Sequence, residues 1–378
     1  MRKFKTVFMR GGTSKGCMFL KQNLPEDRAE WDAIFLQAMG DPDPKQIDGL
    51  GGTVSSNNKI VVVWKSEEPG IDVEYLIGQV VVGKSQVDYK SNCGNMTAAV
   101  GPFAVEEGLV EAKEPLTTVH LLNRNTDKRI DVTVPCENGT IALEGDCVIA
   151  GVDGTAPELK VNFLNPAGAK TGKLLPTGNT LDILEIPEAG KIEATVLDVS
   201  NPMVIVRAED VGLKGTELPE EVNSNQEACE LLEKIRGTVS CKMGFAKDLE
   251  DAAKNSPAVP KIGVFTKPVG FHNLEGEEVK KEEMDLCVRV ISVFKCHKAC
   301  PLTSASAISV AAFLEGSLLQ KELGKPGKDQ KTVRIGHPSG VMTMYPEIEE
   351  KDGELDITGV AAQRTARKIM EVMLYIRK

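Results

Sequence analysis

The sequence predicts an α+β protein built from two similar halves, each with strands wrapped around one central helix. Three observations predict this fold class: short strand-like runs separated by tight turns, few segments with helical periodicity, and a repeat that relates the two halves. The chain of 378 residues is also long for a single domain, so two domains are expected.

Short strands account for most of the expected secondary structure. Turn pairs such as Gly51-Gly52 recur at close intervals, with runs rich in Val, Ile and Thr between them, for example at 59–64. This alternation is typical of strands joined by tight turns. Apolar residues follow helical spacing over 28–39, 226–236 and 360–375. A Rossmann sheet would instead alternate its strands with full crossover helices.

A repeat relates the two halves of the chain. Residues 95–108 and 303–316 align at a constant offset of 208 positions, and both run from polar through small residues to Glu-Gly. Small residues let a helix lie close against strands, and the final Gly suits a left-handed C-cap. We therefore predict central helices over 95–107 and 303–315, domains over 1–186 and 187–350, and a C-terminal helix, 359–376, that packs back on the first domain.

Composition excludes several classes of protein. A net charge of −10 argues against a nucleic-acid partner, which would require a basic surface. The longest apolar runs are strand-length, far below the roughly 20 residues that span a bilayer. Residues 1–8 resemble a first strand more than a signal peptide, so we expect a cytoplasmic protein that is not bound to a membrane.

The cysteines do not resemble a structural framework. There are nine, an odd number, and they include no Cys-x-x-Cys pair, which argues against a disulfide framework or a zinc site. We expect reduced thiols, no metal and no cofactor. A homo-oligomer is compatible with the sequence.

The segment 91–97, Ser-Asn-Cys-Gly-Asn-Met-Thr, is the most informative stretch. It places Cys93 just before the first turn of the first central helix. Free amide groups and the helix dipole stabilise a thiolate at such a position, and the same amides can bind a carboxylate. A lone cysteine is often a small core residue, but the polar, glycine-containing surroundings here favour a reactive group.

Two further segments contain candidate cations. Lys59 lies where the apolar strand 60–64 begins, either as a surface residue or as a positioned cation. The loop 10–16, Arg-Gly-Gly-Thr-Ser-Lys-Gly, resembles a P-loop only superficially, because the order is Ser-Lys-Gly and a strand follows. We interpret this loop as anion-binding, with Thr13, Ser14 and Lys15 as candidates.

The second half offers its own candidates before its central helix. The segment 296–304, Cys-His-Lys-Ala-Cys-Pro-Leu-Thr-Ser, contains His297, which could face Cys93 if the halves pack pseudo-symmetrically. Asn92, Asn95, Thr303 and Ser304 complete the anion-binding candidates. The tight turn 336–340 adds an imidazole and a hydroxyl.

These groups suit proton transfer next to a carboxylate. Such carbon acids are weak, so a site must stabilise the dienolate charge with fixed donors and cations. It also needs one group to remove the proton and another to return it. A thiolate and an ammonium could do this without a metal.

The same residues resemble a known family, the PrpF family. The resemblance is carried by five motifs, Phe8–Gly16, Asp48–Gly52, Asn92–Gly108, Lys242–Gly244 and His337–Gly340, which occur in the family's order over nearly the whole chain. The family includes 2-methylaconitate cis-trans isomerases, 4-oxalomesaconate tautomerases and 3-methylitaconate delta-isomerases. The chain looks most similar to the last group, which acts in anaerobic nicotinate catabolism.

The resemblance implies a diaminopimelate-epimerase-like fold: two pseudo-symmetric halves, each a strand barrel around one helix, with the active site in the interdomain cleft. In that superfamily two cysteines face each other. Here Cys93 aligns with Pro301, one position from Cys300, which argues against a symmetric two-thiol racemase. The family's usual lysine, cysteine and histidine fall on Lys59, Cys93 and His297.

The reaction we predict is an allylic 1,3-proton shift on an unsaturated dicarboxylate, 3-methylitaconate to 2,3-dimethylmaleate. Cys93 is the favoured base and Lys59 the charge stabiliser, with the reverse assignment left open and His297 as another proton donor. The alternatives are a 2-methylaconitate cis-trans isomerase, a 4-oxalomesaconate tautomerase, and a non-catalytic carboxylate-binding accessory protein. The expected partner is the small di- or tricarboxylate substrate.

Overall fold

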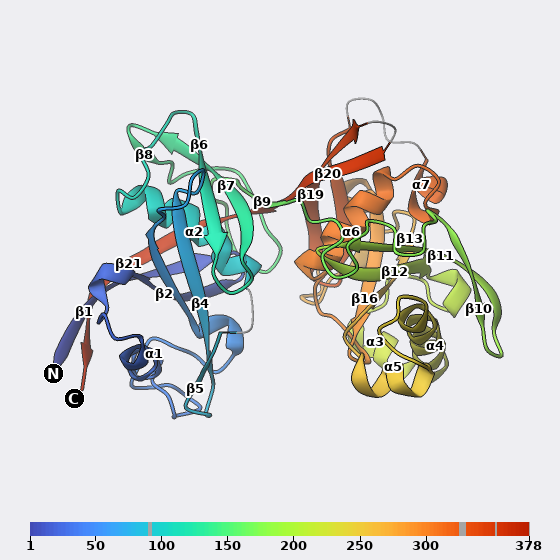
Figure 1. The fold of residues 1–378 in the computed structure, drawn as a ribbon, viewed down its shortest axis with the longest axis horizontal. Helices are drawn as coiled ribbons and strands as arrows, with labels where there is room; N and C mark the ends of the chain where they lie inside the picture. Colours follow the sequence, from blue (N-terminus) through green and yellow to red (C-terminus); the bar gives the residue numbers. More distant parts are fainter. Residues whose placement is uncertain (90–92, 325–329, 352–353, 378) are drawn as a thin grey trace. The chain divides into compact units, whose positions relative to one another are not determined.

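The computed structural model describes residues 1–89, 93–324, 330–351 and 354–377, which form two compact units. Unit 1 comprises Met1–Leu164 and Gln363–Lys378, and unit 2 comprises Asn165–Ala362. Figure 1 shows the elements of both units in sequence colours. In the described part of the chain, every helix is too short or too polar to cross a membrane.

Unit 1 consists of strands around one long buried helix. Its elements are β1 (Arg2–Gly11), β2 (Ser14–Leu20), the 3-10 turns η1 (Lys21–Asn23) and η2 (Arg28–Glu30), α1 (Trp31–Met39), η3 (Ser55–Asn57), β3 (Lys59–Lys65), β4 (Val73–Val81), β5 (Gln86–Asp88), α2 (Gly94–Glu106), β6 (Leu116–Asn123), β7 (Lys128–Glu137), β8 (Thr140–Ile141), β9 (Leu159–Leu164) and β21 (Ala366–Ile376).

Unit 2 has the same kind of core and more helices outside it. Its elements are β10 (Asp182–Ile186), β11 (Gly190–Val199), β12 (Asn201–Arg207), η4 (Glu209–Val211), α3 (Pro219–Ser224), α4 (Gln226–Lys242), α5 (Leu249–Asn255), β13 (Lys261–Thr266), β14 (Phe271–His272), β15 (Glu278–Val279), η5 (Lys281–Glu283), β16 (Leu286–Ser292), β17 (Lys295–Cys296), α6 (Leu302–Phe313), α7 (Leu318–Leu323), β18 (Val333–His337) and β19 (Gly340–Lys351). The chain returns to unit 1 along β20 (Glu354–Arg364).

The two units repeat one order of strand pairing. In unit 1, β1 is antiparallel to β2, β2 parallel to β3, β3 antiparallel to β4, β4 parallel to β6, and β6 antiparallel to β7. In unit 2, β11, β12, β13, β16, β18 and β19 pair in the same sequence of directions. The central helix follows β5 in unit 1 and β17 in unit 2. The predicted α+β class with two pseudo-symmetric halves is confirmed.

Both central helices are buried on nearly all sides. In α2 every residue from Met96 to Val105 is buried, and in α6 every residue from Ser304 to Ala312. A helix that is apolar or small all round has no face suited to water. Small residues permit the close packing: a Cβ on Gly101 would lie 2.7 Å from Cγ1 of Val132 in β7.

The opposite face of each sheet packs against other helices. In unit 1, Ile60 and Val62 of β3 pack with Phe35 of α1. In unit 2, Ile262 and Val264 of β13 belong to the core that contains α4. Because side chains alternate along a strand, the odd-numbered residues of β3 and β13 lie on the face toward α2 and α6.

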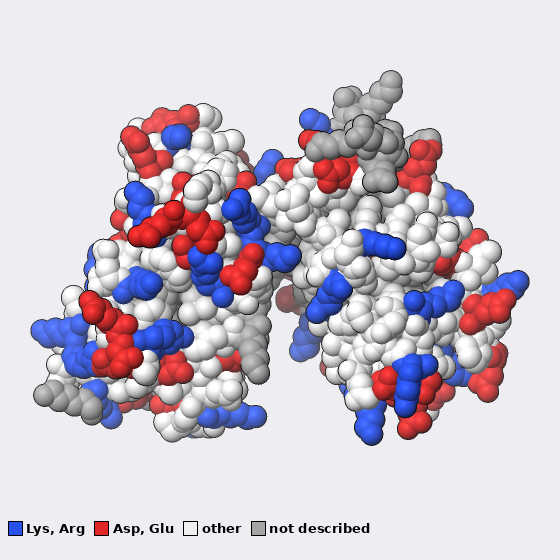
Figure 2. Space-filling view, in the orientation of Figure 1, with Lys and Arg blue, Asp and Glu red and all other residues white. Residues whose placement is uncertain are grey.

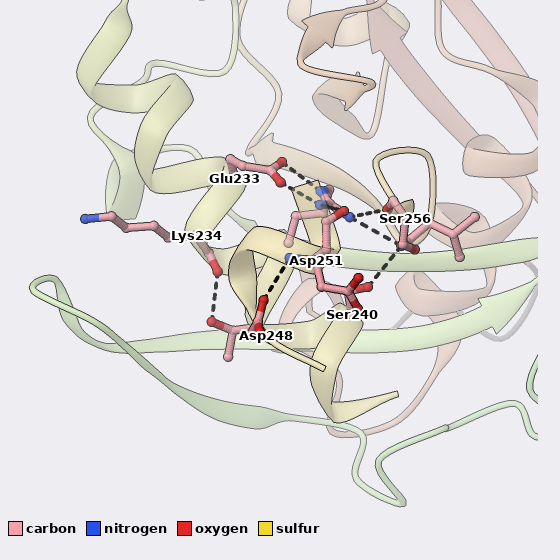
Figure 3. A network of polar contacts seen from close by, with 10 residues as sticks. Glu233, Lys234, Ser240, Asp248, Asp251 and Ser256 are labelled. Carbon is pink, nitrogen blue, oxygen red and sulfur yellow. Dashed lines mark hydrogen bonds and ion pairs between the residues drawn. The ribbon is translucent and has the colours of Figure 1, made fainter. Parts of the chain in front are cut away.

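The buried side chain of Arg236 links two outer helices of unit 2, α4 and α5. Arg236 of α4 is 2% exposed; its guanidinium donates to the carbonyl oxygens of Ala252 (3.0 Å) and Ser256 (2.7 Å), and its Nε donates to Glu233 (2.7 Å). Figure 3 shows this network, with Glu233 and Ser256 labelled. Arg236 also donates to the carbonyl of Val259 (3.3 Å), two residues before β13. The network therefore fixes the segment that leads into Lys261.

The predicted C-terminal helix over 359–376 is wrong. The segment forms the end of β20 and all of β21, which pairs antiparallel with β1 from Arg2 opposite Ile376 to Gly11 opposite Ala366. Exposure alternates residue by residue along β21, as in a strand with one covered face. Ile369 and Met373 are about half exposed. Their separation of four positions is also typical of one face of a helix, which is why the sequence indicated a helix here.

The other predicted boundaries differ by less. The predicted domain boundary at 186/187 falls inside the β10–β11 hairpin, where Ile186 pairs with Gly190. In the structure the first segment of unit 1 ends at Leu164. The central helices were predicted over 95–107 and 303–315, and they span Gly94–Glu106 and Leu302–Phe313.

Candidate active site

Cys93 is the N-cap residue of α2, as the sequence predicts. Its backbone is extended (φ −126°, ψ 93°), and its carbonyl accepts from the amide (3.0 Å) and hydroxyl (3.1 Å) of Thr97. No side chain in the described structure caps this helix start. Because the first amides of a helix have no partner within it, donors remain available beside the partly exposed thiol.

The loop between β1 and β2 packs against this helix start. The Sγ of Cys93 lies 4.0 Å from Oγ of Ser14, and Asn95 Nδ2 donates to Oγ1 of Thr13 at 2.9 Å. Glycine permits the approach, because a Cβ on Gly11 would lie 2.5 Å from the carbonyl oxygen of Asn95. The structure thus brings together four predicted residues, three of which carry hydroxyl or amide groups.

Lys59 begins β3 on the same face of the sheet. It is followed on that face by Val61 and Val63, which pack in the core around α2. Its Nζ donates to Oε1 of Gln79, whose own amide donates to the carbonyl of Val80 at 2.8 Å. Among residues 1–89, 93–324, 330–351 and 354–377, no carboxylate forms an ion pair with Lys59. The ammonium is therefore available to an anion.

A buried tyrosine supports the first turn of α2. The hydroxyl of Tyr75 lies 2.9 Å from Oγ1 of Thr97 and accepts from Asn123 Nδ2 at 2.9 Å. Burial raises the pKa of Tyr75, and the nearby thiol of Cys93 acts in the same direction. Sequence reasoning missed this residue, since nothing in an apolar strand distinguishes a supporting tyrosine from an ordinary core aromatic.

The structure does not bring Lys15 to this group. Its Nζ lies 5.8 Å from the ring centroid of Phe8, and Phe8 belongs to the core around α1. Lys15 follows Ser14 directly, so its side chain points to the opposite face of the sheet. Asn92 lies outside the described residues.

In unit 2 the start of α6 resembles the start of α2. Pro301 is the N-cap and supplies no side-chain acceptor. Oγ1 of Thr303 accepts from Nζ of Lys261 at 3.4 Å. Ser304 is 2% exposed, and within the described chain its hydroxyl has no hydrogen-bond partner.

His297 lies close to the same group. Its Nε2 is buried and also lacks a partner among the described atoms. Burial lowers the pKa of His297, and the positive charge of Lys261 lowers it further. By contrast, His337 in the turn 336–340 is 2% exposed, and its Nδ1 accepts from the amide of Ser339 at 3.2 Å.

Lys261 was missed by sequence reasoning. It begins β13 as Lys59 begins β3, and both strands start Lys-Ile. Burial lowers the pKa of Lys261, while the thiol of Cys300 acts in the opposite direction. The signal was present in the sequence, but the two lysines are 202 positions apart and not 208, so the helix repeat did not align them.

Metal ligands are not grouped in this region. Across the described residues, no three side chains of His, Cys, Asp or Glu lie together as ligands of one ion.

Comparison with known proteins identifies the family. A family model described as PrpF protein matches residues 1–377. The chain belongs to the PrpF family. It is 41% identical to "3-methylitaconate isomerase" of Eubacterium barkeri over 98% of this chain and 97% of that protein. It is 38% identical to "2-methyl-aconitate isomerase" of Shewanella oneidensis, covering 100% of this chain and 97% of that protein.

A solved structure has the same fold. The crystal structure of methylitaconate-delta-isomerase superposes with a TM-score of 0.90 at 38% identity, covering 99% of this chain and 96% of that one. The two-unit architecture described above is therefore shared over almost the full length.

Proposed function

We propose that this PrpF-family chain is an isomerase that moves a C=C bond in a small unsaturated polycarboxylic acid by proton transfer. The observation that carries the proposal is the position of Cys93 as the N-cap residue of α2, with its Sγ 4.0 Å from Oγ of Ser14, on the sheet face that also carries Lys59. The names of the similar isomerases of Eubacterium barkeri and Shewanella oneidensis support the substrate class.

The reaction proceeds through a dienolate. The thiolate of Cys93 removes the acidic proton alpha to a carboxylate, and the electron pair of the broken C–H bond delocalises onto the oxygens of that carboxylate and, through the double bond, onto the methylene carbon. The ammonium of Lys59 stabilises that charge. A proton then adds at the former methylene carbon, so one proton leaves and one returns, and the double bond is displaced.

Three side chains are candidates for returning the proton. Lys59 can return the proton, or the roles of Lys59 and Cys93 can be reversed. His297 is the other donor that the family resemblance indicates. Burial favours its neutral form, so this ring would need to acquire its proton during the cycle.

The substrate we propose is 3-methylitaconate, converted to 2,3-dimethylmaleate. Support comes from the named 3-methylitaconate isomerase relative and from the superposition at a TM-score of 0.90. This assignment would give the chain a role in nicotinate catabolism in the cytoplasm. The alternatives are 2-methylaconitate isomerisation, favoured by the Shewanella oneidensis relative, and 4-oxalomesaconate tautomerisation.

Parallel assays test the function. Ultraviolet absorbance is followed with methylitaconate, methylaconitate and oxalomesaconate, using the wild type, Cys93→Ala and the control Cys241→Ala. We expect turnover by the wild type and control and a loss of about 10²–10⁴-fold in Cys93→Ala, with circular dichroism unchanged. Near-normal turnover by Cys93→Ala would exclude the thiol mechanism. Binding of these acids without turnover would instead support the accessory-protein alternative.

A further inference from the structure

We propose that unit 1 binds a monovalent alkali cation, K⁺ or Na⁺, in the loop that leads from α1 to β3. Its ligands are oxygen atoms of Met39, Gln46 and Asn58, which surround Gly51. The motif Asp48–Gly52 lies in this loop, and the proposed reaction gives it no role. Binding of the cation does not depend on that reaction.

Three oxygen atoms converge beside Gly51. A Cβ on this residue would lie 2.3 Å from Oδ1 of Asn58, 2.3 Å from Oε1 of Gln46 and 2.6 Å from the carbonyl oxygen of Met39. Oxygen atoms gathered so closely repel one another unless a cation or a hydrogen-bond donor lies among them. Ligand oxygens lie about 2.3–2.6 Å from a cation such as Ca²⁺, so one small cation can contact all three atoms.

The two amide oxygens are buried and unpaired. Gln46 is 2% exposed and Asn58 0% exposed. In the described chain, both polar atoms of the Gln46 amide and Oδ1 of Asn58 have no hydrogen-bond partner. The orientation of Asn58 is fixed, because its Nδ2 donates to the carbonyls of Gly52 and Val54, the latter at 2.8 Å. Buried polar atoms are usually satisfied, and one cation would satisfy both oxygens.

The end of α1 favours positive charge at this place. Met39 is the last residue of α1, and its carbonyl accepts from the amide of Gly51 at 3.2 Å, which leaves a second lone pair. The last carbonyls of a helix carry a partial negative charge, which a cation stabilises. A basic side chain often has this role, but the last turn of α1 contains none.

The charges of the loop favour a monovalent ion. Ca²⁺ is typically bound by several carboxylates. Here the carboxylate of Asp43 accepts from two backbone amides of the loop, and exposed Asp48 pairs with Arg377. Asp41, two positions after Met39, has both carboxylate oxygens buried without a partner among the described residues. Neutral oxygens of the kind that coordinate K⁺ in channels, with one such carboxylate nearby, suit a single positive charge.

The backbone of Asn58 links this site to Lys59. The carbonyl oxygen of Asn58 accepts from the amide of Val80 at 3.1 Å and from Nε2 of Gln79 at 3.1 Å. Oε1 of Gln79 in turn accepts from Nζ of Lys59. A cation that fixes Asn58 therefore also fixes the side chain that holds the ammonium, so it should influence activity as well as stability.

Thermal unfolding of the full-length protein tests the inference. Melting temperatures are compared in KCl, NaCl and tetramethylammonium chloride at an equal ionic strength of about 0.1 M, which screens surface charges equally. Such screening matters because acidic and basic side chains are interspersed on the surface that Figure 2 shows. We expect KCl or NaCl to raise the melting temperature by at least about 2 °C over tetramethylammonium chloride, since a ligand of the folded state stabilises it.

Two results of this comparison overturn the proposal. Equal melting temperatures in the three salts are what a bound water, or a rotated Gln46 amide that donates to Asn58, would give. Stabilisation by CaCl₂ but by neither alkali chloride would contradict a monovalent site.

Variants of Gln46 locate the effect. Gln46→Leu should abolish the difference between the salts, whereas Gln46→Glu, which keeps the shape and adds a charge, should enlarge it. Gln37→Leu is the control and should retain the difference, because Gln37 lies in α1 with its Oε1 accepting from the amide of Arg377 at 3.0 Å. A full salt difference in Gln46→Leu, or an unchanged one in Gln46→Glu, overturns the proposal.

Steady-state kinetics measure the link to Lys59. On the acid that the enzyme turns over, we expect kcat/KM to be at least threefold higher in KCl or NaCl than in tetramethylammonium chloride. Gln37→Leu should keep this ratio and Gln46→Leu should lose it. A kcat/KM that is equal in all salts contradicts the link to Lys59. A wild type without turnover contradicts the proposed function, while the melting temperatures still decide whether the cation binds.

Discussion

Gly16 of β2 and Lys59 of β3 are register partners, and a Cβ on Gly16 would lie 2.0 Å from the carbonyl oxygen of Lys59. No side chain fits at that distance, so the start of β3 can keep its position only if residue 16 is glycine. The position of the Lys59 ammonium thus depends on Gly16, although Gly16 has no side chain that could bind substrate or react.

Gly16→Ala should therefore impair activity by displacing Lys59. We expect at least a tenfold loss of kcat/KM and a loss of about 1–3 kcal/mol in the free energy of unfolding, typical of overpacking. Gly270→Ala is the control, because a Cβ on Gly270 would lie 3.5 Å from the carbonyl oxygen of Val279, which is an ordinary contact. Steady-state rates and urea unfolding measure both effects, and wild-type rates in Gly16→Ala would contradict this role of glycine.

Cys93 should be the first thiol to react with a small alkylating reagent at pH 8. Burial raises the pKa of Cys17 to about 12 and that of Cys147 to about 11, which leaves little reactive thiolate at either residue. Burial likewise raises the pKa of Cys229 and Cys241. Peptide mass spectrometry after a brief exposure to iodoacetamide checks this order. Substrate should protect Cys93, and first labelling at another cysteine would contradict the prediction.

His297 should make the protein less stable in acid. Because burial lowers its pKa below the ordinary 6.5, the folded protein binds fewer protons than the unfolded chain between the two pKa values. The stability that the neutral ring provides is thus present above about pH 6.5 and is lost as the pH falls through the folded pKa.

Removing His297 should reduce this loss. Urea unfolding of the wild type, His297→Gln and the control His120→Gln is compared at pH 7.5 and pH 5.5. We expect His297→Gln to lose less stability on acidification than the other two proteins. An equal loss in all three would show that His297 does not contribute.

Arg236 should be needed for the stability of unit 2. Arg236→Met removes the buried guanidinium that donates to the carbonyls of Ala252 and Ser256 and pairs with Glu233, so we expect a loss of about 2–4 kcal/mol in the free energy of unfolding. Lys234→Met, in the same helix, breaks only an exposed pair with Glu188 and should change stability by less than about 1 kcal/mol. Similar unfolding midpoints for the two variants would contradict the buried network's contribution.

Local features of the sequence predicted the residues that meet at the start of α2. The polar, glycine-containing segment at 91–97 located Cys93 at a helix start. The interpretation of the loop 10–16 as anion-binding selected Thr13 and Ser14, which the structure places beside that helix. Both inferences depend on neighbours in sequence, where propensity and capping rules apply. Lys15 could not be assigned in the same way, because its face depends on the exact register of β2.

Features set by distant parts of the chain were harder to predict. β21 is stabilised by pairing with β1, and its exposed apolar residues Ile369 and Met373 gave it a helical spacing. Lys261 was not predicted because the corresponding segments of the two units differ in length. Unit 2 contains α3, α4 and α5 between β12 and β13, whereas unit 1 has α1 as its α-helix between β2 and β3. The offset between corresponding positions therefore changes along the chain, and a fixed-offset comparison finds only the helices.

The pairing of β1 with β21 also determines the order in which the protein can be completed during translation. All of Asn165–Ala362 leaves the ribosome before β21 does, so the strands of unit 2 are complete while β1 still lacks β21, one of its two partner strands. Domains usually fold in the order in which they are synthesised. Here the half that begins first is finished last, and the nascent chain exposes the free edge of β1 until its final strand emerges.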